Sequence, residues 1–578
     1  MTHFLLALAL AVLLGWPLSR YLAAVLHGAP TRLDRLFAPV EAPLYRLLGT
    51  SPAAGMSGGA YARAFLVSNL VLGLLVWLVL MTQAWLPFNP DRIGNMRWDL
   101  ALHTMVSFLT NTNQQHYAGQ AQLSYLAQMT AIVGLQMITP LMALACVAAT
   151  LRGLFGGRHA LAAQARGQQA GAAEAAGHEA DVGNYWADVL RVALRVMLPL
   201  CLVWSLLLTW QGVPATLAAG PVATPLAQAQ ADAPATQKIP LGPVAPMVAA
   251  KQLGSNGGGW YGPNSAVALE NPTPLSNLFE LVAIVLLPVT VVMMVGAFTG
   301  RRRFGAMVFG AMLLMSLVSG GLAAWAEWSA AGPLQAAALE GKELRVGVDG
   351  SAAWAALTTQ VNNGSVNLML DSAAPLTGLV ALSNMLINAI WGGVGCGLQQ
   401  FLVYLMLSVF VAGLMTGRTP ELFGRKIEAP EIKLLALLVL LQPLVVLGLT
   451  AVALSVPGWA GISNPGFHGV SQVLYEYVSA FANNGSGFEG LADASLWWNL
   501  SATLALLAGR YPALLIPLLI AALLARKRRA PASAGSLQIE TPTFALTLIG
   551  VVLILTLLQF MPVLVLGPVA DHLTLGAY

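Results

Sequence analysis

Four short segments combine glycine, asparagine, serine and threonine in a way that could hold a cation. They are residues 110–115, 254–259, 362–365 and 483–487. Glycine adopts backbone conformations that other residues avoid, and this freedom lets carbonyl oxygens be turned toward a common axis. A ring of such oxygens replaces the hydration shell of an ion in channel selectivity filters. These four segments therefore predict a cation pore.

Short apolar stretches precede these segments and must position them. One Asn-Asn-Gly alone is typical of an extracellular turn, but here the arrangement recurs in four connections between apolar runs. Half-helices of this length suit re-entrant segments, and non-helical backbone at membrane depth is tolerated where it lines a water-filled path. Their partially negative C-terminal ends favour a cation. The stretches are 98–109, the residues leading to Gly254, 352–361 and 470–482.

The composition indicates a membrane protein. The chain has 578 residues, of which 57% are hydrophobic and 9% charged, against about 25% charged in soluble proteins. This excludes an ordinary soluble enzyme, a disordered scaffold and a nucleic-acid binder. The three cysteines form no CxxC pair and the eight histidines no HxxxH spacing. We therefore expect no metal other than the transported ion.

We predict an all-α membrane protein with ten spans, because a bilayer core about 30 Å thick needs roughly 20 apolar residues. The spans are 3–26, 62–83, 122–148, 186–209, 276–299, 306–328, 385–415, 432–456, 496–525 and 543–565. An N-terminal span and cytoplasmic link (1–60) and a C-terminal span (540–578) flank four repeats. The repeats cover 61–150, 184–300, 306–417 and 431–530.

The basic residues predict the orientation, because cytoplasmic links are rich in Lys and Arg. Of the 28 Lys and Arg residues, 21 lie at alternate links. We therefore expect these links in the cytoplasm and both termini outside. The run Arg526–Arg529 helps to set the topology and favours contact with anionic membrane lipid rather than nucleic acid. The other basic links contain Arg20, Arg32, Arg35, Arg46, Arg63, Arg152, Arg158, Arg166, Arg191, Arg195, Arg301, Arg302, Arg303, Arg418, Arg425, Lys426 and Lys433.

The second pore segment carries a family resemblance. Gly254–Trp260, continuing through Asn264 and Ser265 to 270–274, resembles the signature of the KdpA family, the potassium-translocating subunits of bacterial Kdp ATPases. The runs 110–113, 482–488 and 413–421 agree with it. The resemblance covers essentially the whole chain. It implies a fold similar to the Trk/Ktr/HKT potassium transporters, with four membrane–pore–membrane repeats around a pseudo-fourfold pore and an extra helix at each end.

The resemblance also implies the site and the partners. Gln115 would lie at the outer mouth of the filter. We expect a KdpB-like P-type ATPase subunit, which would bind ATP and Mg²⁺, a KdpC-like single-span subunit and a small KdpF-like peptide. No cofactor is expected on this chain, which would lie in the bacterial inner membrane. The implied K⁺-binding residues are Asn111, Thr112, Ser255, Asn256, Gly257, Asn362, Asn363, Gly364, Asn483, Asn484 and Gly485.

Two loops depart from the family pattern. In the third loop, Asn362 and Asn363 precede Gly364, where the family often has a small or Ser/Cys-type residue. The first loop has no glycine at its turn. We therefore do not expect four equal contributions to ion coordination.

Two features inside predicted spans suggest a gate. Arg510 lies near the middle of the ninth span, where a charge costs at least about 2.5–3.5 kcal/mol, so it should face a polar interior. By resemblance it would lie below the filter and oppose leakage. Span seven contains Gly392, Gly393, Gly395 and Gly397. These glycines fit either close helix packing or a broken helix that forms an intramembrane gate.

The sequence contains no means of hydrolysing ATP. It has neither a GxxxxGK[ST] phosphate loop nor the Asp-Lys-Thr-Gly motif of P-type pumps. We therefore predict the non-hydrolysing, potassium-binding and translocating subunit of an ATP-driven, high-affinity uptake complex. The alternative is a gradient-driven potassium transporter or channel of the same fold. A remote alternative is an intramembrane enzyme, against which the lack of a polar catalytic cluster speaks.

Overall fold

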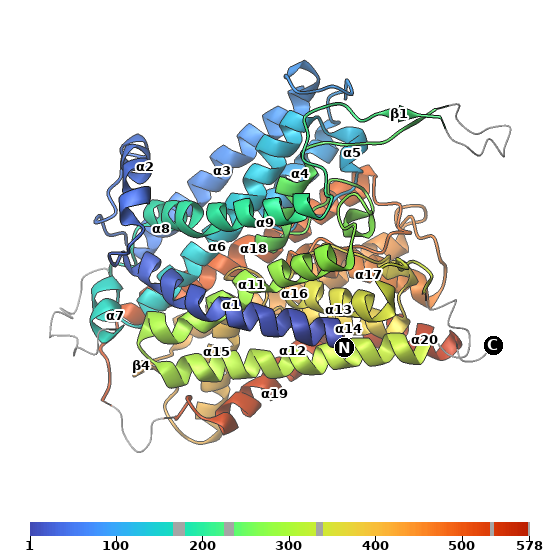
Figure 1. Cartoon of the computed structure of the whole chain (residues 1–578). Helices are drawn as coiled ribbons and strands as arrows, with labels where there is room; N and C mark the ends of the chain where they lie inside the picture. Colours follow the sequence, from blue (N-terminus) through green and yellow to red (C-terminus); the bar gives the residue numbers. More distant parts are fainter. Residues whose placement is uncertain (166–179, 225–235, 331–338, 532–536, 576–578) are drawn as a thin grey trace.

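The computed structural model describes residues 1–165, 180–224, 236–330, 339–531 and 537–575, and the regular secondary structure of these residues is almost entirely helical (Figure 1). Within these ranges, ten helical segments are long and apolar enough to cross a membrane. Arg166, one of the residues used for orientation, lies outside the described residues. The ten segments are α1 (Thr2–His27), α3 with its last turn (Gly58–Trp85), α6 with a π-helical start (Ala127–Leu154), α8–α9 (Tyr185–Trp210), α11 (Pro274–Thr299), α12 (Arg302–Ala330), α15 (Cys396–Met415), α16 (Ala429–Ser455), α18 (Leu496–Ala525) and α19–α20 (Pro542–Thr574).

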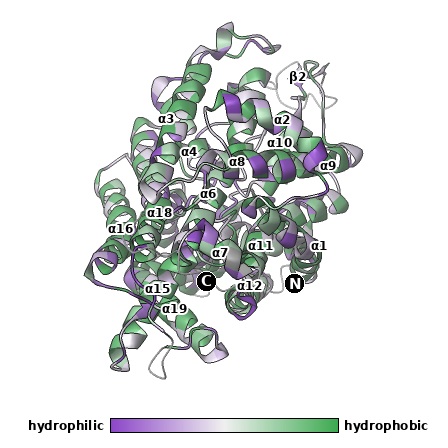
Figure 2. Cartoon of the chain, turned by 90° about the vertical axis from the view of Figure 1, so that its left-hand side faces the viewer, coloured by the Kyte–Doolittle hydropathy of each residue, from purple (hydrophilic) through white to green (hydrophobic). Residues whose placement is uncertain are grey.

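The outer helices expose apolar side chains along their length. On α16, Leu437, Leu440 and Leu444 are all more than half exposed, and only 17% of its most apolar window is buried inside the protein. The helical ribbons are predominantly hydrophobic (Figure 2). A surface of this kind is stable against lipid and not against water. The chain is therefore a multi-pass membrane protein.

Four short helices occupy the connections predicted to contain half-helices. They are α4 (Trp98–Leu109), α10 (Val244–Leu253), α13 (Gly347–Gln360) and α17 (Phe467–Ala482). Each lies between two spans, and α1 packs along α11 outside the four units (Figure 1). The predicted fold class, with four such units and an extra helix at each end, is confirmed. The exact unit boundaries stay a prediction. The remaining elements are α2 (Asp34–Leu47), α5 (Gly119–Gln122), α7 (Arg158–Ala165), α14 (Pro375–Ile387) and the short strands β1 (Val222–Ala223), β2 (Gln237–Lys238), β3 (Glu421–Leu422) and β4 (Arg425–Lys426).

The predicted seventh span, 385–415, is divided into two helices in the structure. Helix α14 ends at Ile387, Asn388 adopts a left-handed conformation with φ 51°, and α15 begins at Cys396. Gly392, Gly393 and Gly395 also have positive φ. Left-handed residues cannot continue a right-handed helix. The chain therefore breaks inside the membrane at the glycine-rich sequence, as one of the two interpretations required.

His468 joins the N-terminal end of α17 to the C-terminal helix. Its Nδ1 lies 2.9 Å from Asp571 Oδ2 and its Nε2 lies 3.0 Å from Asp371 Oδ1. Burial lowers the pKa of His468, but the hydrogen bonds to Asp371 and Asp571 outweigh burial and leave the pKa above its ordinary value. The resulting stabilisation is complete below about pH 6.5 and is lost as the pH rises through the raised pKa.

We expect His468→Gln to reduce the free energy of unfolding by roughly 1–2 kcal/mol at pH 6, and by less at pH 9. Thermal melts of both proteins at the two pH values measure this difference. An equal reduction at both pH values would show that the charge on His468 does not contribute.

Candidate functional site

The four half-helices end in loops that share one backbone pattern. In each loop the first and third residues have positive φ, and the middle residue does not. The middle N–H donates to a carbonyl in the last turns of its own half-helix, namely that of Ser107, Lys251, Thr358 or Ser479. Such alternation turns N–H groups to one side and leaves the carbonyls on the other. The φ values of the first and third residues are 63° and 58° at Asn111 and Asn113, 52° and 71° at Ser255 and Gly257, 51° and 83° at Asn362 and Gly364, and 58° and 101° at Asn483 and Gly485.

The loops contact one another in a closed cycle. A Cβ atom on Gly257 would lie 2.1 Å from the carbonyl oxygen of Asn363, in the third loop. Likewise, a Cβ atom on Gly364 would lie 2.1 Å from Asn484 O in the fourth loop, and a Cβ atom on Gly485 would lie 2.1 Å from Thr112 O in the first loop. In the first loop, Asn113 approaches the second loop at Gly258. Four loops therefore surround one axis, and glycine is required where their backbones meet.

Several asparagine side chains of these loops hold neighbouring loops together. Asn363 Nδ2 donates to Lys251 O at 3.0 Å, and Asn484 Nδ2 donates to Thr358 O at 3.1 Å, each time to the preceding half-helix. Further bonds join Asn111 Nδ2 to Ser255 O, Asn256 Nδ2 to Asn111 Oδ1, Ser255 Oγ to Val361 O, and Asn483 Nδ2 to Thr112 Oγ1. The structure thus brings all eleven sequence-predicted filter residues together. Their amide groups fix the loops, and their carbonyls are the groups left for an ion.

Asn113 takes the place of the glycine that the first loop lacks. Its φ of 58° is positive, as are those of the glycines in the other three loops, which lie between 71° and 101°. The sequence prediction did not include it among the filter residues, although asparagine is among the non-glycine residues that best tolerate this conformation. The third loop also follows the common pattern. Both departures noted in the sequence therefore leave the backbone geometry unchanged.

Two glutamines follow the first loop. Gln115 Nε2 donates to Gly259 O at 3.1 Å, and Gly259 N donates to Gln115 Oε1 at 2.8 Å. This reciprocal pair ties the first loop to the second. Gln114, which sequence reasoning did not single out, donates to the carboxylate of Glu476 on α17. The two side chains thus connect the first loop to both of its neighbours.

A buried ion pair supports the second loop. Lys251, at the end of α10, is completely buried, and its ammonium group pairs with Glu270 and donates to Asn264 Oδ1 at 2.5 Å. Its carbonyl oxygen accepts the N–H groups of Asn256 and Gly257. A buried charge is tolerable only when it is paired. The family signature residues at 264, 265 and 270 therefore act here as a cradle for a lysine directly behind the loop.

The break between α14 and α15 lies against the C-terminal end of the half-helix α13. Gly392 N donates to Gln360 O at 2.9 Å, and a Cβ on Gly393 would lie 3.1 Å from Val361 O. Asn388 Oδ1 accepts from Asn362 Nδ2 at 2.5 Å. Gly395 packs on the backbone of Leu144, and Gly397 on Trp391 O. The glycines allow the chain to cross below the loops at backbone-contact distance.

Arg510 lies beside this break. Its side chain is 4% exposed, NH1 lies 2.6 Å from Cys396 Sγ, and NH2 donates to Thr139 O at 3.3 Å. Thr139 Oγ1 in turn donates to Asn111 Oδ1 at 2.8 Å. Among the residues that the structure describes, no carboxylate pairs with Arg510 within 4.0 Å. The positive charge of Arg510 therefore has no carboxylate partner there, and Thr139 connects it to Asn111 in the first loop.

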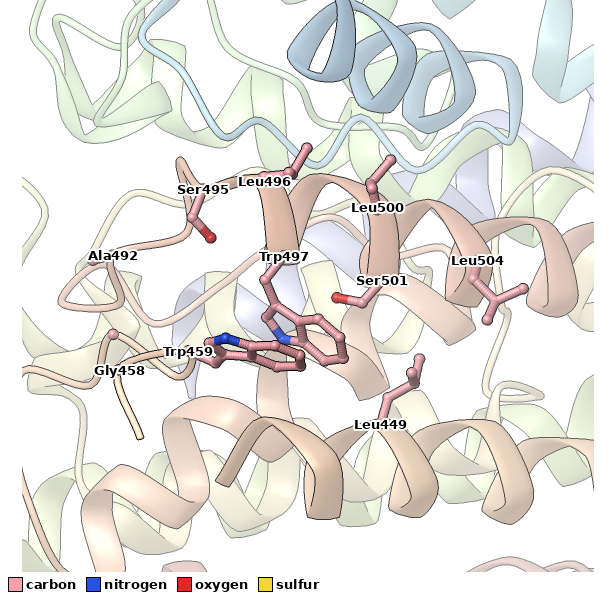
Figure 3. A pocket seen from close by; sticks show the side chains of 11 residues that line it. Leu449, Gly458, Trp459, Ala492, Ser495, Leu496, Trp497, Leu500, Ser501 and Leu504 are labelled. Atoms are coloured by element: carbon pink, nitrogen blue, oxygen red, sulfur yellow. The ribbon is translucent and has the colours of Figure 1, made fainter. Parts of the chain in front are cut away.

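The cavity shown in Figure 3 is separate from this site. It measures about 800 Å³ and lies between α16 and α18, with Trp459 and Trp497 stacked at 4.3 Å between ring centroids. Tryptophan is enriched at membrane–water interfaces. Because the lining is mainly apolar, this cavity is suited to lipid and not to a hydrated ion.

Comparison with known proteins places the chain in a family. The sequence profile described as "KdpA: Potassium-transporting ATPase A subunit" matches residues 5–573. The chain belongs to the KdpA family. It is 41% identical to a "Potassium-transporting ATPase potassium-binding subunit" of Gloeobacter violaceus, over 95% of this chain and 94% of that protein. A protein of the same name from Pseudomonas putida is 42% identical, over 99% and 98%. The potassium transporter TrkH of Vibrio parahaemolyticus aligns over 89% of this KdpA chain and 95% of its own, with 14% identity and a TM-score of 0.49.

Proposed function

We propose that this KdpA chain is the potassium-binding and translocating subunit of an ATP-driven potassium uptake complex. The observation that carries the proposal is the cycle of four loops with one backbone pattern, in which the N–H groups face the half-helices and the carbonyls remain for an ion. The names of the relatives give the ion as potassium. The chain itself is a non-catalytic subunit and obtains energy through its partner.

The proposed filter consists of the carbonyl groups around the middle residues of the four loops. These residues are Thr112, Asn256, Asn363 and Asn484, with the flanking Asn111, Ser255, Gly257, Asn362, Gly364, Asn483 and Gly485. Gln115 closes the outer mouth between the first two loops. Half-helix C-termini carry partial negative charge, so all four favour a cation at the axis.

Below the filter, we assign Arg510 and the break at Gly392–Gly397 to a barrier. The broken segment crosses under the second and third loops, and Arg510 adds an unneutralised positive charge near the first loop. A potassium ion that moves straight inward meets both. The ion would therefore leave sideways, toward the ATPase subunit.

The proposed complex contains a KdpB-like P-type ATPase subunit, which binds ATP and Mg²⁺, with KdpC-like and KdpF-like subunits. This chain would lie in the inner membrane with both termini outside and the basic links in the cytoplasm. The placement rests on the distribution of Lys and Arg. Arg526–Arg529 would then lie at the inner leaflet, near anionic lipid.

The decisive experiment measures ATP hydrolysis by the purified complex with K⁺, Rb⁺ or Na⁺ as the only alkali cation. We expect potassium to stimulate hydrolysis at concentrations at which sodium has no effect. An ATPase subunit should co-purify in stoichiometric amount. No preference for potassium would refute the filter assignment. Potassium transport by the chain without an ATPase partner would favour the gradient-driven alternative.

A further inference from the structure

A second cluster of ion-binding groups lies beside the first and fourth loops. It consists of His116, Glu476 and Asp493, whose ligand atoms all lie within 4.8 Å of one another. Glu476 belongs to α17, whereas His116 and Asp493 belong to the links that follow the first and fourth loops. The three residues are separated by up to 377 positions (116 to 493) in the sequence. The histidine spacing therefore gave no indication of a metal site.

The hydrogen bonds of His116 determine which ring nitrogen faces the carboxylates. Asn499 Nδ2 donates to Asp99 Oδ2 at 2.9 Å, so its Oδ1 is the atom that accepts from His116 Nδ1 at 2.8 Å. The proton of a neutral His116 is therefore on Nδ1. The lone pair on Nε2 then points toward Glu476 Oε1, 3.5 Å away. An imidazole held by a hydrogen bond on its other nitrogen is the arrangement found in metal-ligating histidines.

Among the described residues, no Lys or Arg side chain pairs with Glu476 or Asp493. His116 is 2% exposed, and its Nε2 has no hydrogen-bond partner among the described residues. Gln114 Oε1, next to Glu476, is also buried without a partner there. The ring of His103 stacks on that of His116 at 3.7 Å between centroids, and this contact helps to fix the plane of the His116 ring. A lone pair facing two carboxylates is stable only with a cation between them.

We propose that His116, Glu476 and Asp493 bind a divalent transition-metal ion of the Zn²⁺ class. One imidazole nitrogen and two carboxylate oxygens are ligands that such an ion prefers. With bonds of about 2.1 Å, tetrahedral zinc needs about 3.4 Å between ligand atoms, which the 3.5 Å between His116 and Glu476 already matches. The ion would join the first loop, the fourth half-helix and the link that carries Asp493.

Asp493 is the ligand that is able to adjust and to admit the ion. It is only partly exposed, and its neighbours Ala492 and Ser495 line the cavity of Figure 3. Free space on that side lets the link move, so that the carboxylate closes the remaining distance, from at most 4.8 Å to the spacing of about 3.4 Å that zinc requires. His116 and Glu476 are fixed by Asn499 and Gln114. The site thus has two positioned ligands and one adjustable ligand.

The test measures zinc bound to the chelator-treated, tag-free complex by equilibrium dialysis and elemental analysis. We expect Asp493→Asn and Glu476→Gln to bind one Zn²⁺ fewer per chain than the wild type. His468→Gln is the matched control, because His468 also contacts two carboxylates but through opposite ring nitrogens, so that they do not converge on one ion. It should bind as much zinc as the wild type.

Folding and ligand identity are checked separately. Melting temperatures without metal identify variants that do not fold, and zinc should raise the melting temperature of the wild type more than that of Asp493→Asn. Co²⁺ in place of zinc should give the visible absorption of a site with nitrogen and oxygen ligands. Equal zinc binding by the wild type and both folded variants, or no saturable binding below 100-fold the protein concentration, would overturn the proposal. A proton would then be the cation between His116 and Glu476.

Discussion

Replacing Gly364 with alanine is expected to raise the potassium concentration that half-saturates ATP hydrolysis by about a hundredfold. Gly364 has φ 83°, and the new Cβ would lie 2.1 Å from Asn484 O. The left-handed conformation costs an alanine roughly 1–2 kcal/mol. The overlap must also displace a carbonyl of the fourth loop, so we expect a total loss of about 3 kcal/mol in potassium binding. Potassium titrations of ATP hydrolysis by the purified complex measure this change.

Gly458→Ala is the matched control for Gly364→Ala. Gly458 has φ 82°, and a Cβ there would meet no atom within 4 Å. This variant therefore carries the same backbone strain without the contact between loops. It should retain the wild-type dependence on potassium. If both variants shifted the half-saturating concentration equally, strain alone would explain the effect and the contact with Asn484 would not contribute to the filter.

The sequence was sufficient for the features that depend on local composition. The half-helix predicted over 98–109 ends at Leu109 in the structure as well. Its end could be predicted because the length of the apolar stretch and the Thr-Asn turn that follows are local signals. The sequence also indicated the left-handed positions of the four loops, since glycine and asparagine favour that conformation, whereas the role of these residues as a filter stays a prediction. Asn113 was not among the predicted filter residues, because asparagine indicates a left-handed position less strongly than glycine does. Its left-handed φ follows from the contact with the second loop.

Features that depend on residues far apart in the chain were beyond sequence reasoning. Lys251 appeared as one of several outer basic residues, and only the fold places Glu270 and Asn264 around its ammonium group. In the sequence, His116 is one of eight scattered histidines, and only the fold shows that Glu476 on α17 lies beside it. The glycines of the seventh span allowed two interpretations. The structure favours the broken helix. Gly392 and Gly395 lie directly against the backbones of Gln360 and Leu144, which a continuous helix with side chains could not approach so closely.

Replacing Arg510 with glutamine is expected to make the assembled complex leak potassium. The Arg510 charge has no carboxylate partner within 4.0 Å among the described residues, and it contacts Cys396 at the start of α15 and Thr139 behind the first loop. At an effective dielectric constant of 20, two positive charges 4 Å apart repel by about 4 kcal/mol. Removal of this barrier would raise the passive flux by up to about a thousandfold. Potassium efflux from proteoliposomes without ATP measures it.

Arg510→Lys separates the charge from the shape of the side chain. Lysine retains the positive charge but not the two-nitrogen contact with Cys396 and Thr139. If the charge forms the barrier, the Arg510→Lys complex should therefore not leak potassium. Leakage in both variants would instead assign the barrier to packing around the break.

The filter and the barrier also predict opposite signatures. Gly364→Ala should weaken potassium binding without leakage, because the Arg510 charge remains. Arg510→Gln should leak while the half-saturating potassium concentration stays near that of the wild type, because the four loops stay closed.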